Sequence, residues 1–174
     1  KNNLGQTVLA VGRVMKNRLA GSGLLSLMRE LEQPLTEVLV RMQKRGIRID
    51  AVKFRDFLGQ VQRELERLST RIFTQAGGQF NIRSSQQLSE ILFGKLGLAC
   101  KQKTPGGAQS TSSTVLEGLV HQHPIVSDIL EFRMYEKLRS TYLEPMPALA
   151  DAGGRIHTTF NQLATATGRL SSSN

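Results

Sequence analysis

Residues 51–76 read AVKFRDFLGQVQRELERLSTRIFTQA, and this stretch decides the fold. Steps of three and four place side chains on one face of an α-helix. The stretch therefore predicts one long amphipathic helix with a buried face. Asp50 stands at the N-cap position of this helix, and Gly77-Gly78 ends it. The apolar side chains follow one another at steps of 3, 1, 3, 4, 3 and 4, as Phe54, Phe57, Leu58, Val61, Leu65, Leu68 and Ile72.

The residues before this helix predict two more helices, over 4–19 and 24–45, because apolar side chains recur there at helical spacing. Pro34 lies inside the second pattern, and we expect it to kink the helix or to mark a new start. Gly46 stands where a left-handed C-terminal cap belongs. Residues 47–49 then predict a short extended link to the long helix.

The residues after the long helix predict shorter elements. Ser84 with Gln87 three residues later has the form of a capping box, which predicts a helix that ends at Gly97. The polar, glycine-bearing stretch 98–111 is typical of an exposed loop. A short helix is expected over about 112–121.

The last third predicts a longer helix and then a strand. Pro124 suits the first turn of a helix over roughly 124–143, and prolines 145 and 147 are expected to end it. After a turn at 151–154, residues 155–160 alternate between apolar and polar side chains, which indicates a strand. We expect the strands that pair with it to lie outside this sequence, in a second domain that the chain enters but does not complete.

Charge points to a polyanionic partner. The 174 residues hold 23 Lys and Arg against 14 Asp and Glu, a net charge of +9. Nucleic acid is the simplest partner for such an excess, and an inert basic surface is the alternative. Residues 1–50 carry +5, residues 51–110 carry +5 and residues 111–174 carry −1, so we expect the partner on the first two thirds.

Composition also excludes several classes of protein. The apolar runs are short, which predicts neither a membrane span nor a membrane partner. Cys100 is the single cysteine, so it forms no internal disulfide and builds no cysteine-based zinc site. Its isolation favours a reducing compartment, and we expect a cytoplasmic protein. His121 and His123 do not make a metal site without carboxylates or thiols nearby.

Two groups of side chains suit phosphate oxygens. One group lies around the starts of two helices in 79–111, where small donors and cations gather, and ordinary helix capping is its alternative explanation. The other group lies on one side of the helix over 124–143, where the alternative is a solvated face beside Glu136. The first group is Asn81, Arg83, Ser84, Ser85, Lys101, Lys103, Thr104, Ser110 and Thr111, and the second is Arg133, Lys137, Ser140 and Thr141.

A third series, Arg63, Arg67 and Arg71, recurs every four residues, and we interpret it as a solvated face because Glu64 and Glu66 dilute it. The sequence shows no phosphate-binding loop, no paired-carboxylate motif and no nucleophile with a base, so we assign no catalytic residue. The residues by themselves therefore indicate a mostly helical nucleic-acid-binding module without its own chemistry.

The C-terminal segment then adds a resemblance. Residues 155–162, RIHTTFNQ, followed by residues 165–172, TATGRLSS, closely resemble family A DNA polymerases, the bacterial DNA polymerase I type. Upstream blocks agree in order and spacing. They are ELEQPL at 30–35, GIRID at 46–50, Phe80-Asn81 with SSQQL at 84–88, ILF at 91–93, Lys103-Thr104, STS at 110–112, and Arg133 with Lys137-Leu138 and STY at 140–142.

The resemblance implies that the chain is the helical thumb that grips primer–template duplex behind the active site. Arg133 and Lys137 would contact duplex phosphates, and Arg83, Ser84, Lys101 and Lys103 with their neighbours would touch the backbone at the thumb tip. Arg169 would reach the minor groove, whose acceptors are present on every base pair. His157 would lie on a palm strand near the duplex.

The resemblance also implies a fold and a division of the chain. We expect a mainly α protein, an antiparallel helical thumb with a short β-containing palm stub at its C-terminus. Residues 1–28 would be the tail of an exonuclease-like domain, 29–150 the thumb, and 151–174 the start of the palm.

The polymerase that contains this chain would be a DNA-directed DNA polymerase that uses Mg²⁺ and whose palm and fingers are the chain's partners. The chain itself lacks the metal-binding carboxylates, so it would bind no cofactor and be inactive alone. A non-catalytic helical module that binds nucleic acid or another protein is the alternative function.

Overall fold

The computed structural model describes residues 4–100, 102–103, 106–107 and 109–173. The chain packs as two units. Unit 1 joins the two ends of the chain, Lys1–Arg48 and Asp151–Asn174, and unit 2 is Ile49–Ala150. Unit 1 holds eleven Lys and Arg against four Asp and Glu, whereas unit 2 holds twelve against ten. Most of the excess positive charge therefore belongs to unit 1.

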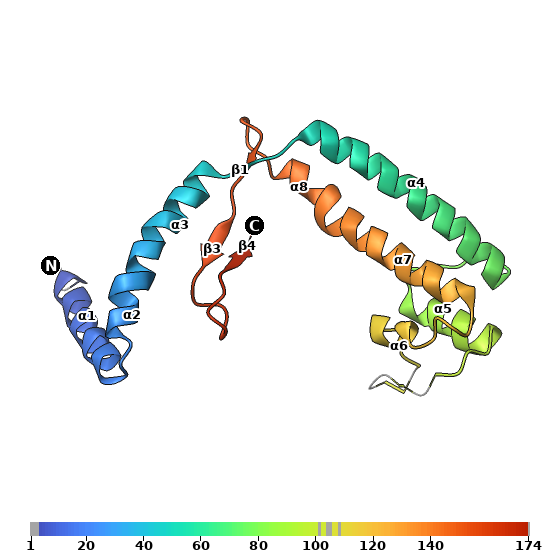
Figure 1. Ribbon diagram of the computed structural model, residues 1–174, viewed down its shortest axis with the longest axis horizontal. Coiled ribbons are helices and arrows are strands. Elements are labelled where there is room, and N and C mark those ends of the chain that lie inside the picture. Colours follow the sequence, from blue (N-terminus) through green and yellow to red (C-terminus); the bar gives the residue numbers. More distant parts are fainter. Residues whose placement is uncertain (1–3, 101, 104–105, 108, 174) are drawn as a thin grey trace. The chain divides into compact units, whose positions relative to one another are not determined.

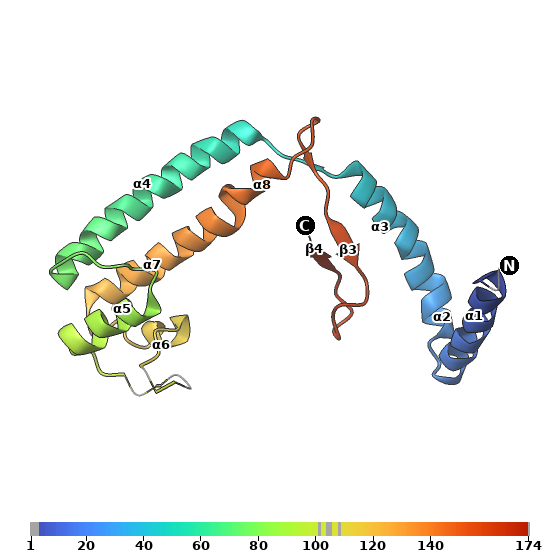
Figure 2. The same cartoon turned by 180° about the vertical axis from the view of Figure 1, so that it is seen from behind.

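Unit 2 is built on two antiparallel helices that lie side by side (Figures 1 and 2). They are α4, Ala51–Ala76, and α7, Pro124–Leu138. The predicted apolar face of α4 is the buried one from Val61 onward, whereas Phe57 of the same series is 44% exposed. Leu68 and Ile72 are fully buried there, and Ile125 and Ile129 are fully buried on α7. Since apolar burial is the main stabilising term in folding, this seam is the core of unit 2.

The ends of α4 follow the predicted capping. The Asp50 carboxylate accepts hydrogen bonds from the backbone N–H groups of Val52 and Lys53, both at 3.1 Å. Gly77 ends the helix in the left-handed conformation at φ 67°. Its N–H donates to the Thr74 carbonyl at 3.2 Å, and the next N–H, that of Gly78, donates to Phe73 at 3.0 Å. This pair of hydrogen bonds is the Schellman motif, which satisfies carbonyl groups that have no partner at the helix end.

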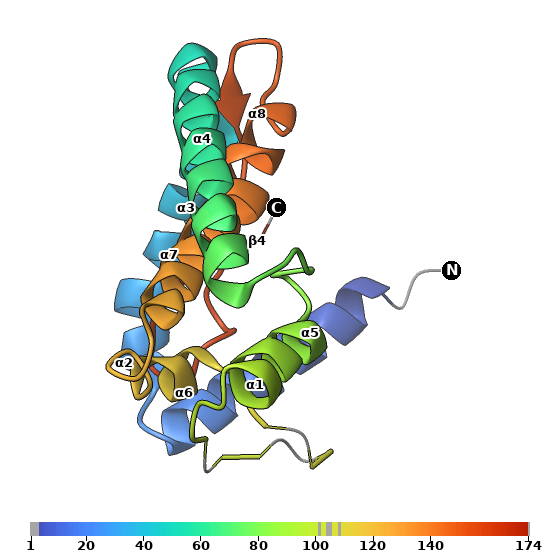
Figure 3. The same ribbon diagram turned by 90° about the vertical axis from the view of Figure 1, so that its right-hand side faces the viewer.

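Short helices cover the far end of the α4–α7 pair (Figure 3). Helix α5, Ser85–Ser89, runs on into the π-helical turn η2, Glu90–Lys95, and α6 is Ser113–Glu117. The capping box forms only in part. Ser84 accepts from the Gln87 N–H at 3.4 Å, but the Gln87 side chain reaches back to the Asn81 N–H at 2.7 Å instead of to Ser84.

One predicted helix end is wrong, and one predicted helix is followed by a further short helix. The helix expected to reach 121 ends at Glu117, because Gly118 is a poor helix former and Leu119 turns into the core at 6% exposure. The helix expected over 124–143 is observed as α7 followed by the π-helical turn η3, Arg139–Leu143. A further short helix, α8, Pro145–Ala148, begins after it. Proline is tolerated in the first turn of a helix because its missing N–H has no partner there, so the prolines begin α8.

A buried carboxylate joins the two long helices. Asp128 of α7 is 3% exposed and accepts from Arg71 of α4 at 2.9 Å and from the Gln75 amide at 2.6 Å. Arg67 pairs with Glu64 at 2.7 Å and approaches Glu131 of α7 at 3.8 Å. The face interpreted as solvated therefore contributes two of its arginines to the contact between the helices, because α7 supplies acidic partners that are more than 50 residues away in the sequence.

The helices of unit 1 are α1, Leu4–Gly21, α2, Leu25–Leu27, the π-helical turn η1, Met28–Glu32, and α3, Gln33–Arg45. Pro34 lies in the first turn of α3, which confirms the expected new start. Helix α1 buries none of its residues. Within residues 4–100, 102–103, 106–107 and 109–173, no helix combines the length and hydropathy that a bilayer-spanning segment requires.

Unit 1 also holds two small antiparallel sheets. Strand β1, Ile47–Arg48, pairs with β2, Arg155–Ile156, and β3, Thr159–Asn161, pairs with β4, Ser171–Ser173. The expectation that residues 155–160 find no partner in this sequence is therefore wrong, and the single predicted strand is two strands. Neither partner strand is evident from the sequence. Strand β1 lies more than 100 residues upstream, and β4 is a run of serines without apolar alternation.

The close contact between α3 and β2 depends on Gly46, which adopts φ 63° and ψ −179°. A Cβ atom at this position would lie 2.7 Å from the Ile156 carbonyl oxygen and 2.8 Å from Cε1 of His157. Only glycine fits there. The mainly α fold with a small β-containing C-terminal part is thus confirmed, whereas the division into 1–28, 29–150 and 151–174 stays a prediction.

Candidate nucleic-acid interface

A concave surface of about 560 Å³ brings together side chains from four segments of unit 2. We call it the α7 cleft. It contains six of the side chains predicted from the sequence, namely Arg83, Ser85, Thr111, Arg133, Lys137 and Ser140. Its other lining residues are Ile82, Ser112, Ser113, Phe132 and Glu136. Three cations and five hydroxyl groups therefore face one space.

Arg133 is held at the wall of this cleft by Thr111. Its guanidinium donates to the backbone carbonyl of Thr111 and, at 3.3 Å, to the Thr111 hydroxyl. Thr111 is 6% exposed, so its position is fixed by the core. Burial lowers the pKa of Arg133, although an arginine still stays protonated at neutral pH. No carboxylate in the described part of the chain forms an ion pair with it, which leaves its charge for an external anion.

Lys137 lies one helical turn further along α7 and is exposed. It belongs to none of the ion pairs among the described residues. Ser140 follows on η3, and its hydroxyl donates to the Glu136 carbonyl at 2.7 Å. Arg133, Lys137 and Ser140 thus line the cleft as their spacing predicts. Thr141 does not line it, because the chain enters the wider π-helical turn η3 at Arg139.

Arg83 differs from the other two cations because it already has a carboxylate. Its guanidinium donates to Glu136 through Nε at 2.5 Å and through a terminal nitrogen at 3.0 Å. The same guanidinium lies 5.6 Å from the centre of the Phe132 ring. Hydrogen bonds from Arg139 and Arg83 lower the pKa of Glu136 to about 2, so this carboxylate is ionised at neutral pH.

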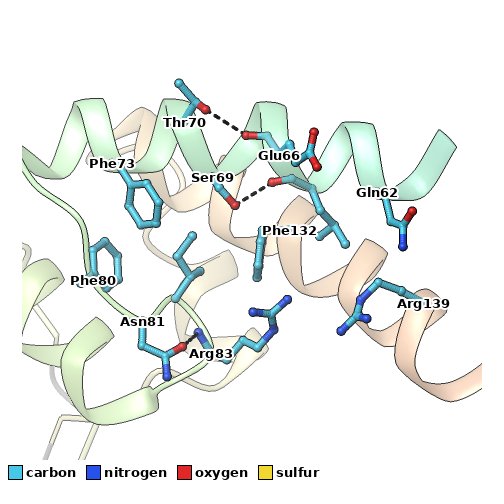
Figure 4. Close-up of a pocket in the computed structure, with 12 residues that line it drawn as sticks. Gln62, Glu66, Ser69, Thr70, Phe73, Phe80, Asn81, Arg83, Phe132 and Arg139 are labelled. Carbon is cyan, nitrogen blue, oxygen red and sulfur yellow. Dashed lines mark hydrogen bonds between the residues drawn. The ribbon is translucent and has the colours of Figure 1, made fainter. Parts of the chain in front are cut away.

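A second and larger concave surface, of about 800 Å³, is lined by α4 and by the loop over residues 80–83 (Figure 4). We call it the α4 cleft. It shares Ile82, Arg83 and Phe132 with the α7 cleft, so Arg83 stands at the wall between the two. Asn81 lines the α4 cleft, and its side-chain oxygen accepts from the Arg83 N–H at 3.0 Å. This bond shapes the loop that presents Arg83.

The remaining tip residues stay apart from the clefts. Ser84 caps α5, and Ser110 accepts from the Ser112 N–H at 3.3 Å, so the capping explanation holds for these two hydroxyls. Lys103 is exposed and pairs through its backbone with Gln109 in an isolated β-bridge. Lys101 and Thr104 lie outside the described residues.

Unit 1 contains two predicted site residues, His157 and Arg169, and they differ in whether their side chains already have hydrogen-bond partners. Both ring nitrogens of His157 are engaged, Nδ1 at 2.7 Å from the Gln43 carbonyl and Nε2 at 3.1 Å from the Asp151 carboxylate. Both partners are acceptors, so the doubly protonated ring satisfies them together, and the hydrogen bonds to Gln43 and Asp151 raise the pKa of His157. The Arg169 side chain is exposed, and its backbone carbonyl accepts from the Thr165 hydroxyl.

Sequence reasoning missed part of the site. Ser112 and Ser113 lie outside the predicted groups, although they directly follow Thr111. Of the two predicted neighbours Ser84 and Ser85, only Ser85 lines the cleft. The place of Ser112 and Ser113 in a short polar run was the available signal. The sequence places Glu136 only on a solvated face, because its partner Arg83 lies 53 positions away.

The comparisons with known proteins decide the family. The family model for DNA polymerase family A matches residues 52–174, which is more than half of the chain. The chain belongs to DNA polymerase family A. This confirms the resemblance carried by residues 155–172 and by the upstream blocks.

Similar proteins agree with this assignment. This family A chain is 49% identical over 152 residues to the thermostable DNA polymerase I of Thermus aquaticus, an alignment that covers 86% of the chain and 18% of the relative. It is 46% identical over 164 residues to that of Thermus thermophilus, covering 92% of the chain and 20% of the relative. The chain therefore spans about a fifth of the length of these relatives.

A solved structure matches the fold as well. The POL domain of Pol1 from M. smegmatis, in complex with DNA primer-template and dNTP, superposes with a TM-score of 0.84 at 30% sequence identity. The match covers 95% of this family A chain and 29% of that chain. The similarity extends over both units, each of which has a counterpart within the matched region.

Proposed function

We propose that this family A chain is the part of a DNA-directed DNA polymerase that holds the primer–template duplex during replication or repair synthesis. Helices α4 and α7 would act as its thumb. The single observation that carries the proposal is the α7 cleft, in which Arg133 and Lys137 share one concave surface with five hydroxyl groups and neither cation has a carboxylate partner among the described residues. The M. smegmatis POL domain supports it, since that domain is in complex with DNA primer-template.

The chemistry of the cleft suits a phosphodiester backbone. Cations and hydroxyl donors bind phosphate oxygens, and such contacts fix the position of a protein on DNA without reading sequence. Arg133 is pre-positioned by Thr111, so little side-chain freedom is lost when a phosphate binds. Lys137 is exposed, and the flexible stem of a lysine lets its ammonium group follow the backbone. The grip we propose is therefore independent of sequence.

Other predicted residues extend this interface. We propose that the tip, with Ser84, Lys101, Lys103, Thr104 and Ser110, touches the backbone further from the active site, and that Thr141 flanks the α7 cleft. Arg169 of unit 1 would reach minor-groove acceptors. His157 would stand beside the duplex without a hydrogen bond from its ring, because both of its nitrogens are already engaged.

We further propose that the polymerase containing this chain requires Mg²⁺ and that its catalytic carboxylates come from palm and fingers segments. Two-metal phosphoryl chemistry needs several carboxylates around a pair of ions. The described part of this chain offers no group of three or more His, Cys, Asp or Glu side chains that could hold a metal ion, so it does not fit such a centre. The role proposed for this chain is to bind and orient the duplex, and alone it would be inactive.

Fluorescence anisotropy of the 174-residue chain on a labelled primer–template tests the proposal. Five phosphate or groove contacts predict that log K falls with log salt at a slope of about −4 to −5 and that duplex is preferred over the matched single strand. Arg133→Gln is expected to make this slope shallower by about one. Arg55→Gln removes an exposed cation of α4 and is the matched control, for which we expect no comparable change.

Two results would contradict the proposed duplex grip, and a third would indicate a different partner. A slope near zero, or equal losses for Arg133→Gln and Arg55→Gln, would remove the assignment of the α7 cleft. Salt-sensitive binding to an acidic protein without preference for duplex DNA would instead indicate a protein-interaction module.

A further inference from the structure

One carboxylate serves two guanidinium groups at the wall between the clefts. Oε1 of Glu136 accepts from Arg83 at 2.5 Å and from Arg139 at 2.7 Å, and Oε2 accepts from the same two residues at 3.0 Å and 2.9 Å. Arg139 also pairs with Glu144, whereas Arg83 forms an ion pair with Glu136 alone among the described acidic residues. The charge of Arg83 is therefore compensated by a single group.

This arrangement places a carboxylate where a phosphate would otherwise bind. Bidentate pairing is the geometry in which a guanidinium recognises both carboxylates and phosphates, so the two anions compete for the same pair of N–H groups. The Arg83 side chain is 56% exposed and lines both clefts, whereas that of Glu136 is only 17% exposed. A phosphate that enters the α7 cleft can thus reach Arg83, but Glu136 already occupies its Nε and one terminal nitrogen and compensates its charge.

We propose that Glu136 is an internal counterion that withholds Arg83 from the DNA backbone and so limits how tightly the α7 cleft holds duplex. The inference rests on the proposed function, because it concerns the strength of the same interface. Glu136 is a positioning residue in this scheme and does not touch DNA. Arg133 and Lys137 make the contacts in the native protein, and Arg83 contributes fully only when Glu136 is neutral.

The first test is Glu136→Gln in the 174-residue chain, measured as anisotropy on a primer–template across a salt series. Glutamine keeps the shape of the side chain and removes its charge. We expect binding at 0.1 M salt to tighten by roughly three- to tenfold and the salt slope to become steeper by about one, the amount for one added phosphate contact. Glu131→Gln is the control, because it makes the same change in net charge on the same helix, beside Arg67 instead of Arg83.

A second comparison does not depend on the folding of the Glu136 variant. Arg83→Gln in the native background is expected to leave the salt slope unchanged, whereas Arg133→Gln makes it shallower by about one. The double variant Arg83→Gln with Glu136→Gln is expected to lose the gain of the single Glu136 variant. Circular dichroism and a thermal melt establish that each variant is folded.

The outcomes separate this inference from the proposed function. If Arg133→Gln weakens binding but Glu136→Gln and Glu131→Gln behave alike, the internal counterion is overturned and the duplex grip stands. Equal loss of slope in Arg83→Gln and Arg133→Gln would also overturn it. If Arg133→Gln changes nothing, the proposed function itself fails.

Discussion

The guanidinium of Arg71 on α4 lies 2.9 Å from the carboxylate of Asp128 on α7, whose side chain is only 4% exposed. The pair joins the two long helices one turn from the Schellman end of α4. Gln75 shares the same carboxylate, and its own side-chain oxygen is buried without a hydrogen-bond partner among the described groups. Asp128 is therefore the hub of a polar contact inside an otherwise apolar seam.

Asp128→Ala is expected to lower the free energy of unfolding of unit 2 by about 2 kcal/mol, because it leaves the Gln75 amide and the Arg71 guanidinium without their acceptor. Asp128→Asn should cost less, since an amide oxygen still accepts. The chain has no Trp, and both Tyr residues, Tyr135 and Tyr142, lie in unit 2, so tyrosine fluorescence in a urea titration reports on this unit. Glu131→Ala is the control on the same helix. Its side chain is 40% exposed and only approaches Arg67 at 3.8 Å, so we expect a smaller change in the midpoint.

Gly46→Ala is expected to disrupt the β1–β2 pairing of unit 1. The backbone of Gly46 lies in a region that only glycine populates readily, and a Cβ would meet the Ile156 carbonyl at 2.7 Å. We expect a cost of about 1–3 kcal/mol, visible as faster hydrogen exchange of the amides in 47–48 and 155–156. Gly12→Ala in α1 is the contrasting variant, because a Cβ there meets nothing within 4 Å. Unchanged exchange in the Gly46 variant would refute this steric account.

The contact of His157 with Asp151 is expected to depend on pH. Hydrogen bonds to Gln43 and then to Asp151 raise the pKa of His157, with Arg155 opposing the shift. Hydrogen bonds from the Arg155 backbone and from His157 lower the pKa of Asp151. A raised histidine pKa contributes stability that is complete below the ordinary value of about 6.5 and is lost as pH rises through the folded value. The lowered aspartate pKa contributes stability that is lost on acidification.

The two effects overlap between about pH 4 and pH 6.5, where the contact should be strongest. An NMR titration of the His157 Cε1 proton would measure its pKa directly, and Asp151→Asn should move that pKa down. Hydrogen exchange near residues 151–157 should then become faster from pH 6 to pH 8 than the intrinsic rate explains. An unshifted histidine in both proteins would show that the contact does not form in solution.

Arg133→Lys is expected to weaken duplex binding although it keeps the charge. Lysine cannot reproduce the planar fork that donates to Thr111, so the cation is no longer held at the wall of the α7 cleft. We expect the salt slope to stay near the native value and the affinity to fall by roughly three- to tenfold. Lys137→Arg is the complementary variant and should be close to native, because the Lys137 side chain is exposed and has no partner to lose among the described residues. Equal effects of the two swaps would show that Thr111 does not position Arg133.

Local sequence patterns determined the elements of unit 2. The extent of α4 follows from the apolar steps between Phe54 and Ile72, from the Asp50 cap and from the paired glycines. Helical geometry places Arg133, Lys137 and Ser140 on one surface. The family was also readable, since residues 155–172 contain a run specific enough to be recognised without a structure. These features depend on residues within a few turns of one another.

Contacts between distant residues were decided only by the tertiary structure. The pairing of Arg83 with Glu136, of Arg71 with Asp128 and of β1 with β2 joins residues that lie 53, 57 and more than 100 positions apart. Hydrophobic periodicity and capping signals describe one segment at a time, so they cannot show which charged side chain a second segment brings close. For the same reason the sequence identified the cations of the interface, but only the fold shows which of them already has a counterion.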